Sequence, residues 1–279
     1  MANKAKKKLG SSEILSQLEE ISGRNIWEFE LKGLTRKTRD LLSSLLNQIL
    51  EKNSITSPVA TFYLFSGLIE ILLNALKGNM RYVVYKNELM KRISDQETTE
   101  GDTEILLDTI LATSPLRDAM TRYIIPDKIK KYVQTVLKLE EKIRTKKEAL
   151  SNEEEILLNN FRKQIKLYDY KISMKVVLTD EDFYIRIRNN VPISTFDQSR
   201  IENSRKLHKS LHAEGRSADF FRPENVDDTE SAGFGIAMVD EGYYNMGLDP
   251  MELFNITSSS KSTTVYMKYP LEALRSYVA

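Results

Sequence analysis

Three polar side chains interrupt an otherwise apolar stretch of the sequence between residues 57 and 80. Glu70, Asn74 and Lys77 are spaced i, i+4 and i+7, which places a carboxylate, an amide and an ammonium group on one face of a helix. The residues between them are apolar almost all round, as is typical of a buried helix. Two interpretations follow: the three groups mark the solvent-exposed edge of the helix, or they face a ligand.

The order EILLNALK from Glu70 to Lys77 resembles the N-box of the ATPase family shared by DNA gyrase, the ninety-kilodalton heat-shock chaperones, sensor histidine kinases and mismatch-repair proteins. The resemblance implies that Asn74 coordinates a Mg²⁺ ion bridging the phosphates of ATP. It also implies that Glu70 positions or activates water, and that Lys77 lies near phosphate. These residue types suit that chemistry, because Mg²⁺ prefers oxygen ligands and usually keeps several waters beside substrate phosphates.

Two further stretches resemble parts of histidine-kinase ATPase domains. SAGFGIAMV, residues 231 to 239, is similar to the second glycine box, in which a glycine pair lets backbone N–H groups approach phosphates at a helix start. The pair here is Gly233 and Gly235, and Ser231 replaces the first glycine of that box. The alternative is a tight loop entering a core helix. The pattern TTVYMKYP, residues 263 to 270, resembles the end of such a domain and implies that Thr264 contacts the nucleotide region.

The first glycine box of the family is altered in this chain. Asn189 stands where the family has an aspartate that accepts a hydrogen bond from the adenine amino group, and Val191 and Ile193 replace glycines. Asn189 can still accept a hydrogen bond through its carbonyl oxygen, but without the assistance of a charge. The resemblance thus implies ATP and Mg²⁺ as cofactors, with an adenine site that Val191 narrows.

The first motif is expected on a helix from residue 57 to residue 80. Ser57 is a suitable N-cap, Pro58 fits the first helical position, and Gly78 is typical of a helix end. Residues 80 to 85 favour a strand.

Upstream, residues 1 to 10 are predicted to be a disordered tail, followed by a short helix that Gly23 ends. Trp27, Phe29 and Leu31 alternate with charged residues, which predicts a half-buried strand. A helix from about 34 to 51 is expected to pack on the domain or to pair with a second copy as a homodimer.

A helical insertion is expected between about residues 94 and 168. An acidic linker from 94 to 104 precedes predicted helices at 104–112, 116–124 and 127–150. Ser151 and Glu154 form a predicted capping box that begins a helix to about 167 and makes an αα-hairpin with its predecessor. The charged residues of this hairpin indicate a solvated face, or a surface that binds a partner protein. Such an insertion is foreign to a typical sensor kinase.

The remainder predicts the sheet. Strands are expected at 172–176 and 184–188 with a turn between them, and later at 253–257 and 263–270. The polar stretch 194–230 predicts a long mobile loop containing a short helix around 201–211, which would order over a ligand. The expected fold class is α/β, an α+β two-layer sandwich with a mixed sheet covered on one face by helices, and the resemblance implies a histidine-kinase-like ATPase fold with the helical insertion. Residues 1–56 are expected to form an N-terminal tail, helices and a strand, and the resemblance implies that residues 57–279 form an ATP-binding domain.

Composition narrows the function classes. The chain has 279 residues with 41 Lys and Arg against 40 Asp and Glu, so net charge gives no reason to expect a nucleic acid or a membrane as partner. It contains no cysteine, which excludes thiolate catalysis and disulfides. No uninterrupted apolar run reaches the ~18 residues of a membrane span. A soluble cytoplasmic protein is expected.

Three hypotheses for function remain. The first is an ATP-Mg-binding signalling protein, an ATPase or a protein kinase acting on Ser or Thr. Autophosphorylation on an N-terminal helix is excluded, because the two histidines are His208 and His212. The second hypothesis is a non-catalytic adaptor that keeps the fold and binds partner proteins through its N-terminal helices or its insertion. The third, in which His208 or His212 accepts phosphate, competes with ordinary solvated histidines.

Overall fold

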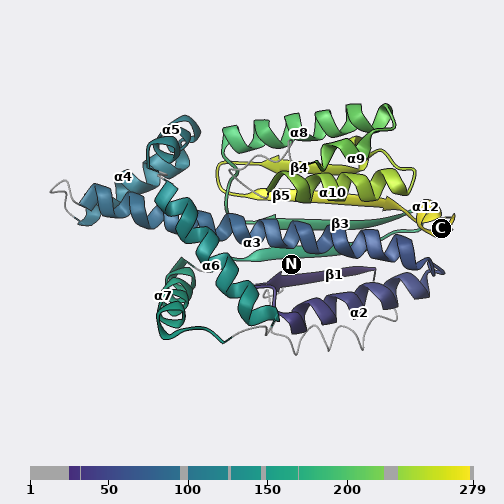
Figure 1. Cartoon of the computed structure of the whole chain (residues 1–279), viewed down its shortest axis with the longest axis horizontal. Helices are drawn as coiled ribbons and strands as arrows, with labels where there is room; N and C mark the ends of the chain where they lie inside the picture. The colour runs from purple at the N-terminus through teal and green to yellow at the C-terminus, as the bar shows by residue number, and fades with distance from the viewer. Residues whose placement is uncertain are drawn as a thin grey trace, which may run out of the picture.

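The computed structural model describes residues 25–31, 33–94, 100–124, 127–145, 149–168, 170–222 and 232–276. A five-stranded sheet forms one layer and helices form the other (Figure 1). The strands lie in the order β1-β2-β3-β5-β4, and their bounds are β1 Ile26–Leu31, β2 Ile172–Leu178, β3 Asp182–Asn189, β4 Phe254–Ser258 and β5 Thr263–Pro270.

Every neighbouring pair of these strands is antiparallel. The expected mixed sheet is therefore wrong, although the strands predicted around 27–31, 172–176, 184–188, 253–257 and 263–270 are all present. β2–β3 and β4–β5 are joined by short turns, and short turns connect antiparallel strands. β5 lies antiparallel to β3, which completes the pattern at the centre of the sheet.

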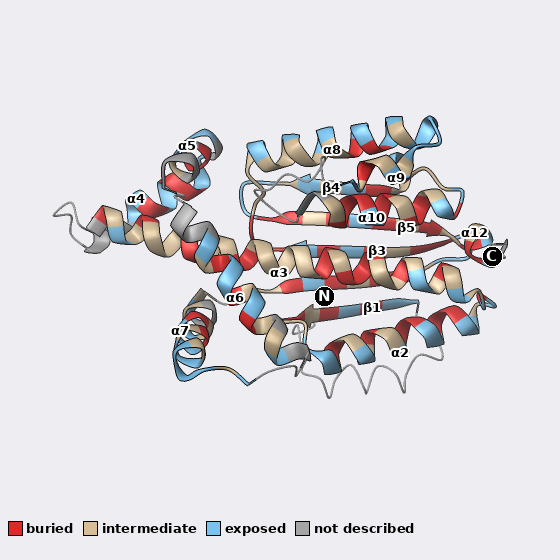
Figure 2. Cartoon of the chain, viewed as in Figure 1, coloured by how far each residue is buried: buried red, intermediate tan, exposed pale blue. Residues whose placement is uncertain are grey.

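Helices cover one face of the sheet, as predicted. Along β3, Phe183, Ile185 and Ile187 are buried, whereas Arg186 and Arg188 on the opposite face are exposed (Figure 2). The helices that share the main core with the strands are α2 Arg36–Lys52, α3 Pro58–Ser94, α10 Ala232–Asn245 and the short α12 Leu271–Ser276. β1 is part of the same sheet and α2 packs on α3, so the boundary expected at residue 56 falls inside one layered unit.

The helix α3 begins as predicted but does not end at Gly78. Ser57 Oγ accepts a hydrogen bond from the Ala60 N–H (3.3 Å), and the helix then continues to Ser94, a length of about 55 Å. The strand expected at 80–85 is thus wrong. Those residues are helical because the insertion packs around them: Val84 belongs to a cluster with α6 and α7, and Leu89 to one with α4.

Gly78 does not end the helix. Among the glycines that the structure describes, positive φ occurs at Gly215 and Gly247. A Cβ at Gly78 would lie in ordinary van der Waals contact with Nδ2 of Asn189 (3.6 Å), so the end of β3 lies beside α3 at this point.

The insertion consists of four helices, α4 Glu100–Ala112, α5 Ser114–Ile124, α6 Asp127–Thr145 and α7 Asn152–Tyr168. The capping box is confirmed: the Ser151 N–H donates to Glu154 Oε2 (3.0 Å), and the Glu154 N–H donates to Ser151 Oγ (3.2 Å). Ion pairs Arg162–Glu140 and Lys142–Glu154 (both 2.9 Å) join α6 to α7. Of the linker expected at 94–104, Ser94 ends α3 and residues 100–104 belong to α4. Residues 95–99, like the N-terminal tail and short helix expected before Gly23, lie outside the described residues.

Residues 195–220 form helices and not the long loop that the polar sequence predicts. α8 spans Thr195–Ala213 and α9 spans Ser217–Phe220; the short helices α11 Pro250–Leu253 and α12 Leu271–Ser276 flank the last hairpin. Ser194 caps α8 by accepting the Asp197 N–H (3.0 Å). The buried residues of α8 are Arg205 and His208, so its inner face is polar and gives no apolar period.

Among the described residues, α3 is the helix long and apolar enough to cross a membrane by length and composition. Its apolar residues face the sheet and the insertion, where Leu64, Leu68 and Leu72 are fully or almost fully buried. This is the burial of a core helix, and the arrangement is consistent with a soluble protein.

Candidate functional site

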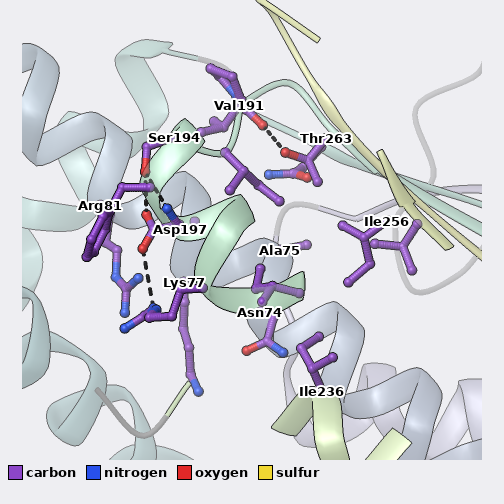
Figure 3. A pocket seen from close by; sticks show the side chains of 18 of the residues that line it. Asn74, Ala75, Lys77, Arg81, Val191, Ser194, Asp197, Ile236, Ile256 and Thr263 are labelled. Carbon is purple, nitrogen blue, oxygen red and sulfur yellow. Dashed lines mark hydrogen bonds and ion pairs between the residues drawn. The ribbon is translucent and has the colours of Figure 1, made fainter. Parts of the chain in front are cut away.

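A cavity of about 740 Å³ lies beside α3, between the end of β3 and the helix α8 (Figure 3). Its walls come from residues 71–85 of α3, 187–193 at and after the end of β3, and 196–207 of α8, with smaller contributions from α5, α9, α10, β4 and β5. Most of the lining atoms are apolar, and the volume is in the range of small-molecule sites, about 300–1,000 Å³. The cavity is large enough for a nucleotide.

Two of the three polar residues of the first motif line this cavity. Asn74 and Lys77 lie on the wall that α3 provides, next to Ala75. Neither side chain has a hydrogen-bond or ion-pair partner within the part of the chain that the structure describes. Their polar groups therefore remain available to a ligand.

Asn189 also lines the cavity and is held by a hydrogen bond to α3. Its Nδ2 donates to Oδ1 of Asn79 (3.1 Å), and both side chains are buried. Because Nδ2 is engaged, Oδ1 of Asn189 is the atom left to accept a hydrogen bond from a ligand. The structure therefore brings Asn189 together with Asn74 and Lys77, from which it is more than 100 residues away in the sequence.

The threonine that lines the cavity is Thr263, the neighbour of the predicted Thr264. Thr263 is buried, and its Oγ1 donates to the carbonyl oxygen of Val191 (2.7 Å). Thr264 lies beside Arg188 on the open face of the sheet. The alternating burial along β5 distinguishes the two threonines. Thr263 lies on the same face of the sheet as the buried Val265, and Thr264 lies on the other face.

Glu70 and Gly235 are brought together, but outside the lining of the cavity. A Cβ at Gly235 would lie 1.8 Å from Glu70 Oε1, so the carboxylate occupies the space that a side chain there would fill. Gly233 lies in the first turn of α10, one of the turns that leave N–H groups without helical partners. Of the glycine pair, Gly235 thus faces the carboxylate of the first motif.

Three arginines that sequence reasoning missed also line the cavity. Arg81 comes from α3, Arg117 from α5 of the insertion and Arg200 from α8. Arg200 forms an ion pair with Asp197 (3.3 Å), the carboxylate among the described lining residues. In Figure 3, Arg81 and Asp197 lie on the opposite side of the cavity from Ile256. Of these arginines, only Arg81 could have been found from the sequence, because its i, i+4 spacing from Lys77 places both side chains on one face of the helix.

The insertion is tied to α8 at this end of the cavity. Asp118 Oδ2 accepts hydrogen bonds from the N–H (3.2 Å) and the hydroxyl group of Thr195, the first residue of α8. The neighbouring Arg117 is buried, and its Nη1 donates to the carbonyl oxygen of Ser260 (3.2 Å) in the β4–β5 turn. The insertion therefore contributes to the wall of the cavity and is not a separate appendage.

Tyr82 adds a neutral donor to the same wall. Burial raises the pKa of Tyr82 to about 12, and the nearby Arg117 opposes this rise. The phenol therefore keeps its proton at neutral pH and can donate to an acceptor.

The two histidines lie outside the lining of the cavity. His208 is fully buried among aromatic rings, and its Nε2 donates to Glu241 Oε2 (3.0 Å). Burial lowers the pKa of His208, against the smaller opposing effects of Glu241 and Asp240. His212 stacks on Tyr244. Burial makes His208 inaccessible to a phosphate donor. Stacking on Tyr244 accounts for the position of His212, so neither histidine needs a role as phosphate acceptor to explain its environment.

The donor set fits Mg²⁺ only when a ligand completes it. The described residues contain no group of three or more His, Asp or Glu side chains that could hold a metal ion. Asn74 offers one amide oxygen to the cavity, while Asp197 is engaged by Ser194 and Arg200. Mg²⁺ is commonly held by few protein oxygens together with phosphates and waters, so a single protein ligand suffices.

Comparison of the chain with protein-family models, with curated proteins and with solved structures finds no match to any of them.

Proposed function

We propose that this protein binds ATP with Mg²⁺ in the cavity beside α3 and acts in signalling, as a histidine-kinase-like ATPase or protein kinase. The observation that carries the proposal is the convergence of Asn74, Lys77 and Asn189 on one cavity of nucleotide size. The sequence pattern alone also singles out each of these residues. A surface edge of a helix gives no reason for such convergence.

The chemistry of each group suits its proposed role. The amide oxygen of Asn74 is a ligand for Mg²⁺, which when bound would neutralise phosphate charge. The Lys77 ammonium has no partner within the described residues and would contact phosphate. Asn189 would accept the adenine amino group at Oδ1, because its Nδ2 already donates to Asn79. Val191 and Ile256 supply the apolar wall for a purine ring.

The proposed chemical step is ATP hydrolysis or transfer to Ser or Thr of a partner protein, with Glu70 as the group that positions water or the attacking hydroxyl. The carboxylate of Glu70 packs on Gly235, outside the lining of the cavity. It must therefore turn away from α10 before it can reach a ligand, and the same movement would open the glycine pair. Nucleotide binding has more support than catalysis.

A second candidate is a non-catalytic adaptor located, like the first, in the cytoplasm. The hydrogen bond between Asn189 and Asn79 favours it, because the polar group at the adenine position is already partly satisfied within the protein. The insertion also exposes apolar residues, Ile105, Ile156 and Leu167, that suit a partner protein.

Calorimetric titration of ATP with and without Mg²⁺ tests the proposal in wild type and in Asn74→Ala. We expect the substitution to remove most of the gain in affinity that Mg²⁺ provides and to leave metal-free binding nearly unchanged. Asn47→Ala, at an exposed position of α2, is the matched control. Equal affinities of wild type and Asn74→Ala in the presence of Mg²⁺ would reject the metal role of Asn74.

A further inference from the structure

Two buried side-chain amides meet where the end of β3 lies beside α3. Asn79 is 4% exposed and Asn189 is 6% exposed, and Nδ2 of Asn189 donates to Oδ1 of Asn79 (3.1 Å). Within the part of the chain that the structure describes, this is the one hydrogen bond that either side chain makes. Asn189 also lines the cavity, so the other end of its amide, occupied by Oδ1, is the end open to a ligand.

Both amides can be turned over without loss of this hydrogen bond. Each carries an oxygen that accepts and an NH₂ group that donates, and the two ends have nearly the same shape. When both side chains rotate by half a turn about their last bond, Nδ2 of Asn79 donates to Oδ1 of Asn189. Nδ2 of Asn189 then takes the position at the cavity. The pair therefore presents an acceptor to the cavity in one arrangement and a donor in the other, with one hydrogen bond in each.

The polar group across the sheet from Asn189 is also both a donor and an acceptor. Thr263 pairs with Asn189 in the register of β3 and β5 and lines the cavity. Its hydroxyl group donates to the carbonyl oxygen of Val191 (2.7 Å, Figure 3) and keeps its oxygen as an acceptor. Among the described lining residues, the carboxylate is Asp197, which belongs to α8 and pairs with Arg200 (3.3 Å). In the described structure, the direction of hydrogen bonding on the Asn189 side is therefore not fixed by a carboxylate.

We infer that the Asn79–Asn189 pair lets the site bind 6-oxopurine nucleotides, of the guanine or hypoxanthine type, as well as adenine nucleotides. Adenine has an amino group at position 6, which donates to Oδ1 of Asn189. Guanine and hypoxanthine have an oxygen there, which accepts from Nδ2 of Asn189 once the pair has turned over. The inference rests on the proposed function for one point, that a purine nucleotide occupies the cavity with its base at Asn189.

An aspartate at this position lacks the same freedom. An ionised carboxylate only accepts hydrogen bonds, so it pairs with the amino group of adenine and repels the oxygen of a 6-oxopurine. A site that leaves its buried polar group unpaired rejects the analogue strongly. The replacement by Asn189 thereby broadens the range of bases. Asn79 is a positioning residue, because it determines which atom of Asn189 faces the cavity.

Calorimetric titration of ATP, ITP and GTP in the presence of Mg²⁺ tests the inference. The base of ITP is hypoxanthine, which has no amino group at position 2 and so matches adenine in size. We expect ATP and ITP to bind wild type with affinities within about tenfold of each other, because one neutral hydrogen bond to the base forms in each case. GTP distinguishes the two 6-oxopurines, since binding of ITP without GTP assigns the second base as hypoxanthine.

Two variants fix the direction of the hydrogen bond. In Asn79→Asp, titrated at pH 8.5 so that the new carboxylate is ionised, residue 79 only accepts, and Nδ2 of Asn189 must donate to it. Oδ1 of Asn189 then stays at the cavity, so ITP should weaken about tenfold to a hundredfold relative to ATP, although residue 79 lies outside the cavity lining. Asn189→Asp should produce the same preference directly, and it serves as the test if Asn79→Asp does not fold.

Asn47→Asp, at an exposed position of α2, is the matched control and should keep the ratio of ATP to ITP affinity of wild type. Circular dichroism at the pH of the titration verifies that each variant is folded.

The outcomes separate the inference from the proposed function. Binding of ATP to wild type, with ITP weaker by more than about tenfold, overturns the inference and retains the adenine nucleotide. Similar binding of ATP and ITP with an unchanged ratio in both aspartate variants also overturns it, because the pair then does not select the base. No binding of ATP, ITP or GTP to wild type rejects the proposed function and the inference with it.

Discussion

The two sides of the cavity satisfy their polar groups in different ways. At the Asn189 side, the protein provides the partners itself: Asn189 donates to Asn79, and Thr263 donates to the carbonyl oxygen of Val191. At the side where α3 presents Asn74 and Lys77, neither side chain has a hydrogen-bond or ion-pair partner among the described residues. The difference indicates that the Asn189 side is completed by folding and the side of Asn74 and Lys77 by a ligand.

This division assigns separate roles to the two sides in the proposed complex. The charge of Lys77 would supply much of the affinity, since ionic hydrogen bonds are about twice as strong as neutral ones. The Asn189 side would supply selectivity through its shape and the amide of Asn189. Substitutions at the Asn189 side should therefore change stability or selectivity.

The largest effect on stability is expected from Asn79→Ala. It removes the acceptor for Asn189 Nδ2 and leaves a buried donor without a partner, which costs about 1–3 kcal/mol. Urea denaturation measures the change. The exposed control Asn47→Ala should lie within about 0.5 kcal/mol of wild type. An equally small change in Asn79→Ala would show that the Asn189 side is not completed by this hydrogen bond.

Asn189→Asp should tighten ATP binding about fivefold to tenfold, roughly 1 kcal/mol, because a charged acceptor replaces a neutral one. The Asn79 amide must rotate so that its NH₂ group donates to the new carboxylate. This is possible because an amide carries both a donor and an acceptor. Val191→Gly should increase affinity further by enlarging the site. Calorimetry on the single variants and the double variant measures both effects. No binding of ATP in wild type or any variant would leave the adaptor as the remaining function.

The contact between Glu70 and Gly235 predicts a coupling of about 1 kcal/mol in a double-mutant cycle. Gly235→Ala alone should destabilise the fold or leave it unchanged, because the new methyl group must displace the carboxylate. In the Glu70→Ala background the same substitution should stabilise by about 0.5–1 kcal/mol, the helix preference of Ala over Gly. Thermal or urea unfolding of the four proteins gives the coupling. Additive effects would mean that the two residues do not touch in solution.

The smallest effect concerns the pH dependence of stability and His208 of α8, which lies outside the lining of the cavity. Burial lowers the pKa of His208 below its unfolded value of about 6.5, so the unfolded chain takes up a proton more readily than the folded one. The contribution of His208 to stability is therefore complete above about pH 6.5 and declines as the pH falls below it. Melting temperatures at pH 7.5 and 5.5 should differ more in wild type than in His208→Gln. His212→Gln, at an exposed position, should behave as wild type.

The start of α3, the two hairpins of the sheet and the capping box before α7 could be predicted from the sequence because local chemistry determines them. Asn74, Lys77 and Asn189 were found for the same reason, as residue types in a recognisable order. Only the part of α8 around residues 201–211 was predicted as a helix. Its full length was missed because α8 buries Arg205 and His208, and buried polar residues leave no apolar period.

The other differences depend on tertiary contacts. α3 continues beyond Gly78 because the insertion packs on Val84 and Leu89, which no local signal indicates. Arg117 reaches the cavity only through the packing of α5 beside α8. The choice of Thr264 over Thr263 was an error of phase, which the burial of Val265 corrects.

Blocking the cavity tests the central claim, that ATP binds there, most directly. Ala75 lines the cavity next to Asn74, and a phenylalanine in its place would fill the space that we propose for the nucleotide. Ala213→Phe, at the exposed end of α8, is the matched control. Calorimetric titration of ATP and Mg²⁺ should give saturable binding with one nucleotide per chain in wild type and in the control, and none in Ala75→Phe. Binding to Ala75→Phe with the affinity of wild type, or no binding to wild type at millimolar ATP, would contradict the account.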